Sequence, residues 1–230
     1  FFKSINITSE KRKKLKYNFA IYDTKGKNNS FSYTEFATGI TYQPVNAFTL
    51  AFTPSLSSNK NKLQYITQTS FNTDARYITA NLDQNTLSAS IRLDYNINPN
   101  LTIQYYGQPF ISRGRYNGFN RVINPTAFYY GDRVSLFDSN QIHFDEAKNS
   151  YQIDEDANGI TDYSIHNPDF AFVQFRSNLV ARWEYIPGSE IFLVWSQGIT
   201  SNGDASENLF TELNAQILGR KPTNTFLIKM

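Results

Sequence analysis

The residues of this sequence that could bind a metal lie in one acidic segment. Oxygen-bearing side chains stand at positions 154, 156, 158 and 162, and a glycine, Gly159, follows the third of them. Alternate oxygen ligands around a sharp glycine turn are typical of the start of a calcium-binding loop, in which the seventh residue supplies its backbone carbonyl. The predicted calcium ligands are Asp154, Asp156, Asn158, the carbonyl of Ile160, and Asp162.

This loop departs from the usual calcium pattern at its twelfth position. An acid normally stands there, whereas this sequence has Ile165, and only Asp169, outside the loop, could substitute for it. The alternative is a solvated acidic turn without a metal. If calcium binds, we expect a weak site of ~10⁻⁴–10⁻³ M affinity that makes a long loop rigid.

Catalytic chemistry has little support in the sequence. The chain has no cysteine and only two histidines, His143 and His166, so neither a thiol nucleophile nor the usual zinc sites can be assembled. The Gly-x-Ser-x-Gly pattern of many serine hydrolases is also missing, although residue types alone leave a Ser–His dyad open. We therefore predict that the protein is not an enzyme.

The composition is unusual for a soluble domain. Charged residues make up 18% of the 230 residues, against roughly 25% in an average soluble domain, while aromatic residues reach 16%. The net charge of +2 gives no reason to expect nucleic acid as a partner. No apolar run approaches the roughly 18 residues that a transmembrane helix needs.

Apolar and polar residues alternate along most of the chain, which predicts β-strands. Between residues 86 and 97, for example, apolar residues share one face of the predicted strand and polar residues the other. Residues 98–100 then form a predicted tight turn. The expected strands cover residues 2–8, 15–24, 31–43, 48–57, 63–71, 76–82, 86–97, 101–111, 170–185, 190–200 and 222–230.

The connections between these strands differ between the two ends of the predicted sheet. One end has short turns, at 9–14, 44–47, 72–75, 98–100 and 186–189. The other end has 25–30, 58–62, 83–85 and two long connections, at about 112–169 and 202–221. Short periplasmic turns opposite long extracellular loops are typical of outer-membrane barrels. The fold expected is therefore all-β, an antiparallel transmembrane β-barrel spanning residues 1–230 as one domain.

Two further features favour a membrane barrel over a soluble sandwich. The polar faces carry Ser, Thr, Asn and Gln with a few charges that could pair across a lumen, such as Arg176, Arg182 and Glu184. Aromatic rings lie near predicted strand ends, where they would anchor at the headgroup level. These are Tyr95, Trp183, Tyr185 and Trp195.

The expected strand number is eleven, whereas bacterial single-chain barrels usually have an even number. We interpret the chain as a portion of a larger barrel, most simply its C-terminal part, with a miscounted strand as the alternative. The sequence opens at Phe1 without a signal peptide, and an exported protein needs one, so we expect further residues upstream.

Several segments, taken in order, resemble an uncharacterised family of Bacteroidota outer-membrane proteins. These segments are residues 77–88, 99–101, 106–110, 167–170, 175–178, 182–185 and 192–195. The resemblance implies an upstream carbohydrate-binding-like domain of the family 9 type, followed by a large C-terminal barrel of unknown function. It brings no catalytic residues with it.

The predicted function is an integral outer-membrane barrel that acts as a pore or as a membrane anchor, in a glycan-handling role. One alternative is a non-conducting subunit of a larger outer-membrane assembly, and another is a soluble carbohydrate-binding β domain. The expected partners are the lipid bilayer of the outer membrane, other outer-membrane or periplasmic proteins, and glycans. Calcium is the one cofactor predicted.

Overall fold

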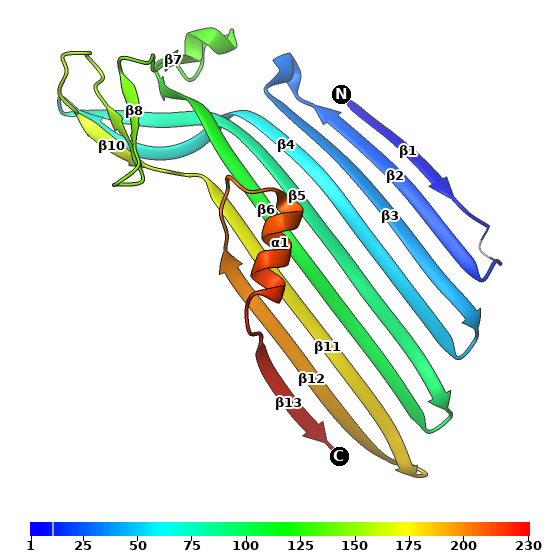
Figure 1. The fold of residues 1–230 in the computed structure, drawn as a ribbon. Helices are drawn as coiled ribbons and strands as arrows, with labels where there is room; N and C mark the ends of the chain where they lie inside the picture. Colours follow the sequence, from blue (N-terminus) through cyan, green and yellow to red (C-terminus); the bar gives the residue numbers. More distant parts are fainter. Residues whose placement is uncertain (11) are drawn as a thin grey trace.

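The computed structural model describes residues 1–10 and 12–230, so Lys11 of the predicted 9–14 turn lies outside it. The described chain is all-β and antiparallel, with one broad open sheet, a small second sheet and one α-helix (Figure 1). The broad sheet is a meander that ends in two edge strands, so its described strands do not close into a barrel. In pairing order these are β1 (Phe2–Thr8), β2 (Leu15–Lys25), β3 (Phe31–Val45), β4 (Phe48–Phe71), β5 (Asp74–Asn98), β6 (Leu101–Val122), β11 (Phe170–Ile186), β12 (Ser189–Asn202) and β13 (Thr223–Lys229).

The remaining elements lie in the two long connections and in one short one. Between β6 and β11 come η2 (Tyr130–Arg133), β7 (Val134–Leu136), β8 (Ile142–Asp145), β9 (Ser150–Ile153) and β10 (Tyr163–His166). β7 pairs with β6, and β8, β9 and β10 form the small sheet. The helix α1 (Leu209–Leu218) lies between β12 and β13, and η1 (Lys27–Asn29) lies between β2 and β3.

Two predicted connections are wrong, because they lie inside long strands. Residues 58–62 and 83–85 were expected to be loops, but β4 and β5 run through them for 24 and 25 residues. Their polar side chains pair across the strands, as in the ion pair of Lys60 with Asp83 at 3.5 Å. Cross-strand pairing therefore outweighs the low strand propensity of these residues.

One predicted turn lies at the wrong end of the sheet as a consequence. The turn expected at 72–75 is observed at Asn72–Thr73, where both residues have positive φ, but it joins β4 and β5 at the long-connection end. The short turns around 9–14, 44–47, 98–100 and 186–189 do share one end, as predicted. β6 also continues to Val122, beyond the expected 111, so the first long connection is shorter than expected.

The broad sheet has one apolar face and one polar face. Cross-strand partners define them, because residues opposite one another point to the same side. A row of the apolar face joins, strand by strand, Ile5, Ile21, Phe36, Leu56, Leu87, Ile111 and Val173. We call this the upper row. Between it and the short turns, the apolar face of the described strands carries no charged residue.

The register of the sheet shifts steadily from strand to strand. Along the upper row, Phe36 is nine residues from the turn end of its strand, Leu87 is eleven and Val173 is thirteen. The distance from the upper row to the turn end therefore grows by two residues from β3 to β5 and by two more from β5 to β11, which is about one residue per strand. A stagger of about one residue per strand corresponds to a strand tilt of about 36°, within the range found in β-barrels.

Two clusters of buried side chains lie outside the middle of the sheet. The larger joins the small sheet to the far ends of β4–β6, with Ile78 and Ile153 fully buried. Ile78 and Ala80 share the polar-face side of β5 with Gln84, so the small sheet packs on that side. The smaller cluster packs Leu209 of α1 on Ile111 and Val173, and therefore covers the top of the apolar face.

Among the described residues no helix is both long and apolar enough to span a membrane.

Candidate functional site

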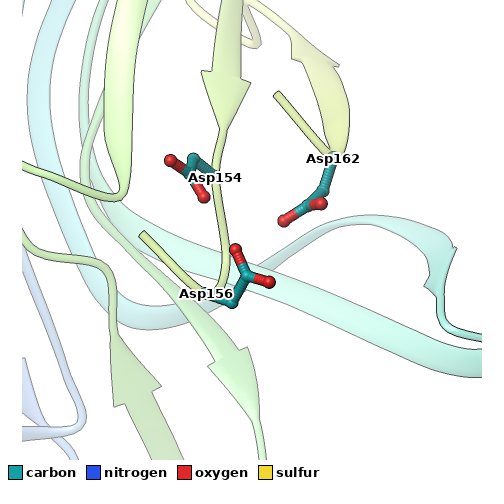
Figure 2. Close-up of side chains that lie close together, drawn as sticks. All are labelled: Asp154, Asp156 and Asp162. Carbon is teal, nitrogen blue, oxygen red and sulfur yellow. The ribbon is translucent and has the colours of Figure 1, made fainter. Parts of the chain in front are cut away.

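The acidic loop predicted to bind calcium lies between β9 and β10. The carboxylates of Asp154, Asp156 and Asp162 lie close together, with one ligand oxygen of each within 4.8 Å of the others. Figure 2 shows these side chains around one small space, two from the start of the loop and the third from its return. Three of the five predicted ligand residues therefore converge as the sequence spacing indicated.

The loop holds its own carboxylates in place through backbone donors. Asp154 accepts hydrogen bonds from the N–H groups of Asn158 at 3.0 Å and Gly159 at 2.6 Å. Asp162 accepts one from the N–H of Glu155 at 2.7 Å. Gly159 has a φ of +90°, so the sharp turn expected at this glycine is confirmed. The carboxylates are thereby preorganised before any cation is added.

These donors also set the charge of Asp154. The residue is 8% exposed, and burial alone would raise the pKa of its carboxyl group. The hydrogen bonds from Gly159 and Asn158 outweigh burial and lower the pKa instead. Asp154 therefore stays ionised at neutral pH, the form that a cation binds.

The other predicted ligand positions are occupied differently. The side-chain oxygen of Asn158 accepts from the N–H of Ile160 at 2.9 Å, and the Ile160 side chain is exposed. Ile165, at the twelfth position, is buried in the core of the small sheet. Asp169, the suggested substitute, instead accepts from the N–H of Tyr116 on β6 at 2.7 Å. Asp169 is therefore not among the carboxylates that converge in the loop.

Glu155 is a structural residue that the sequence reading missed. Its side chain is 2% exposed and accepts from Arg76 of β5 at 2.8 Å, from Arg121 of β6, and from the hydroxyl of Tyr163 at 2.8 Å. Burial, and to a lesser extent the hydrogen bond to Glu155, raises the pKa of Tyr163. The phenol therefore stays protonated and donates a hydrogen bond to Glu155. This cluster fixes the acidic loop to the broad sheet. Sequence gives no signal for it, because the arginines lie over 30 residues away.

The polar face of the broad sheet carries hydrogen-bonded side chains and paired charges. Arg182 contacts Glu190 through Nε at 3.0 Å and lies 3.9 Å from Glu184, which supports the predicted pairing of this arginine. Elsewhere on this face, Ser55 bonds Ser88 at 2.8 Å. Arg176, which the sequence also predicted to lie on the polar face, is found there. These contacts join polar groups of neighbouring strands to one another across the polar face.

The apolar face, in contrast, leaves many large side chains exposed. Trp183 is 52% exposed, Leu193 50% and Phe36 47%. Six tyrosines and tryptophans of this face lie within five residues of the short turns: Tyr17, Tyr42, Tyr95, Tyr105, Trp183 and Tyr185. Three of the four predicted girdle residues are among them. Trp195 lies deeper, stacked on Phe226 at 5.8 Å between ring centroids.

The two histidines lie on separate strands of the small sheet. His143 in β8 and His166 in β10 are both exposed. Their two strands are separated by β9.

A family model described as a domain of unknown function, DUF5916, matches residues 1–230. The comparison with curated proteins found no match, and neither did the comparison with solved structures.

Proposed function

The chain belongs to the DUF5916 family, whose description assigns no activity, and from its own structure we propose that it forms part of the wall of an outer-membrane β-barrel. The barrel would serve as a pore or as a membrane anchor. One observation carries this proposal: between the upper row and the short turns, the apolar face of the described strands is free of charge, rich in large apolar side chains and largely exposed.

The height of this apolar face matches the hydrocarbon layer of a membrane. On β5 it extends from Leu87 to Ile97, ten residues at about 3.3 Å each. With a tilt of about 36°, this spans roughly 27 Å, close to the ~25 Å apolar band of outer-membrane barrels. A soluble sandwich would bury such a face under a second layer, whereas α1 covers only its upper end here.

The two native tryptophans provide a direct test of lipid contact. Both Trp183 and Trp195 point to the apolar face. In vesicles with brominated acyl chains, we expect strong quenching of their fluorescence. Protein that stays folded in detergent-free buffer, with tryptophans quenched by acrylamide but not by brominated lipid, would contradict the proposal. That result would favour the soluble carbohydrate-binding alternative.

A matched pair of variants separates the two faces. In a background in which phenylalanine replaces both tryptophans, Leu179→Trp places a probe on the apolar face and Val180→Trp places one on the polar face. Because these neighbours differ only in the face that they occupy, we expect brominated lipid to quench the first variant severalfold more than the second. Equal quenching of the two variants would contradict the proposal that the apolar face contacts lipid and the polar face does not.

One observation favours the non-conducting alternative over an open pore. The small sheet lies on the polar-face side and is fixed there by Glu155, where it would narrow the mouth of a barrel. Planar-bilayer conductance tests this directly. Steady open channels would support the pore, whereas a silent barrel that becomes conducting after deletion of residues 138–166 would support a closed mouth.

We also propose that the acidic loop binds calcium as a structural ion. The converging carboxylates of Asp154, Asp156 and Asp162 support this proposal. The exposed Asp156→Asn variant should reduce the calcium affinity by at least tenfold in titration calorimetry, because an anionic ligand is lost from a weak site. Asp145→Asn, at the last residue of β8, is the control and should keep the parental heats. Equal heats from Asp156→Asn and the parent would remove the site.

The origin in Bacteroidota, the upstream carbohydrate-binding-like domain, the glycan-handling role, protein partners in the outer membrane or periplasm, and the absence of enzymatic activity stay predictions from the sequence.

A further inference from the structure

Basic residues gather on the broad sheet just beyond the charge-free region. Lys25 of β2 and Lys60 of β4 are both cross-strand partners of Ser32 on β3, so their side chains lie on the apolar face at one level. Both are exposed, and each lies four residues beyond the upper-row residue of its strand, Ile21 or Leu56. Lys3 extends the group onto β1, next to Asp23.

A basic pocket adjoins this group at the same end of the sheet. It has a volume of about 340 Å³ and lies between η1 and the connection that precedes β7. Its lining includes Lys27, Arg133, Ser30, Thr126 and Phe128. The carbonyl of Ser30 accepts from the N–H of Lys62 on β4 at 3.0 Å, so the pocket is joined to the strand that carries Lys60.

The described lining of this pocket contains two cations, two hydroxyl groups and no carboxylate. Nε of Arg133 donates to the carbonyl of Ala127 at 2.7 Å, which fixes the arginine, and no other side-chain N–H of Arg133 donates to a described residue. Guanidinium, ammonium and hydroxyl donors around one space are the groups that bind phosphate. The strands beside the pocket also carry two acids, Asp83, which pairs with Lys60 at 3.5 Å, and Asp23, which accepts from Thr34 at 3.1 Å, so Lys25 is the flanking lysine that lacks an acidic cross-strand partner.

We propose that this pocket, together with the flanking Lys25, binds the phosphate-bearing headgroup of a lipid in the outer leaflet. The proposal rests on the membrane placement proposed above. A lipid fits better than free phosphate for two reasons. The basic group directly continues the apolar face, so acyl chains and headgroup would be bound together. Phe128, which lines the pocket, and the adjacent Tyr129 are 75% and 67% exposed and add apolar surface there.

Native mass spectrometry of the full chain in detergent tests this proposal. The probes are a diphosphorylated glucosamine lipid and the same lipid without phosphates. We expect the phosphorylated lipid to bind at least tenfold more tightly, since one charge-assisted hydrogen bond is worth about that factor. The Lys27→Gln/Arg133→Gln variant should lose this preference. Lys27→Gln alone, at an exposed position, should lose part of it without disturbing the loop that Arg133 orders.

The matched control is Lys13→Gln/Lys14→Gln, which removes the same charge from exposed residues at the opposite end of the sheet. It should keep the parental preference. The proposed site would be overturned if the parent protein bound both lipids equally well. It would also be overturned if the control variant lost as much of the preference for the phosphorylated lipid as Lys27→Gln/Arg133→Gln does. Full displacement by millimolar inorganic phosphate would assign it to free phosphate instead. Brominated-lipid quenching of the same variants distinguishes a failure of this site from a failure of the membrane proposal. Tryptophan quenching combined with equal binding of the two lipids would contradict the phosphate site and leave the membrane proposal intact.

Discussion

Glu155→Ala is expected to release the small sheet from the broad sheet at a cost of about 3 kcal/mol. The substitution leaves Arg76 and Arg121 without their shared carboxylate and removes the acceptor of the Tyr163 hydroxyl. Breaking a buried ion pair by removing one partner costs ~3–5 kcal/mol. The lower end applies because the two arginine side chains remain 19% and 32% exposed and can recover some hydration.

The effect should be local, and hydrogen exchange can locate it. A loss of about 3 kcal/mol corresponds to an increase of roughly 100-fold in the exchange rate of amides that open with the small sheet. We expect this increase in β9 and β10 and little change in β11 and β12. Glu146→Ala, in an exposed turn of the same connection, is the control and should exchange as the parent does. Unchanged exchange in Glu155→Ala would show that the apolar contacts alone hold the sheet.

Ile91→Arg is expected to destabilise the protein in vesicles by about 2–4 kcal/mol, although Ile91 is 36% exposed. At an exposed position of a soluble protein the same change would cost less than about 0.5 kcal/mol. The difference arises because Ile91 lies near the middle of the apolar face, where the surrounding medium would be hydrocarbon. Equilibrium unfolding from vesicles in guanidinium, followed by tryptophan fluorescence, gives the free energy of unfolding.

Ser90→Arg is the matched control for Ile91→Arg. Ser90 is the preceding residue on β5 and points to the polar face, which it shares with Arg92 and Asp94. A new charge there would meet water and existing polar groups, so we expect little change in the free energy of unfolding. If both variants cost the same, or if Ile91→Arg costs nothing, the apolar face is not in lipid.

The alternation of residue types predicted the strands well where one face is apolar. The expected strands at 2–8, 15–24, 31–43, 170–185 and 190–200 match β1, β2, β3, β11 and β12 to within two residues at each end. The pattern failed at 58–62 and 83–85, because beyond the apolar face both sides of a strand are polar. The sequence there has the composition of a loop, and only the pairing of β4 with β5 keeps it extended.

In the candidate calcium loop, too, one feature could be predicted from the sequence and another could not. Alternate acids and a glycine within nine residues were sufficient to predict that Asp154, Asp156 and Asp162 converge, because the ligands of such a loop are local in sequence. The attachment of that loop was not predictable. It depends on Arg76 and Arg121, which reach Glu155 only after β5, β6 and the small sheet have assembled.

The sequence by itself determined the all-β architecture, the two faces of the strands and the acidic turn, because each follows from side-chain periodicity or from neighbours within one segment. Only the tertiary structure decided that β4 and β5 are single long strands, that the small sheet packs on the polar-face side, and that basic residues form a rim beyond the charge-free apolar face. Those features arise from contacts between distant segments. Their free energy comes from burial and cross-strand pairing that no local pattern encodes.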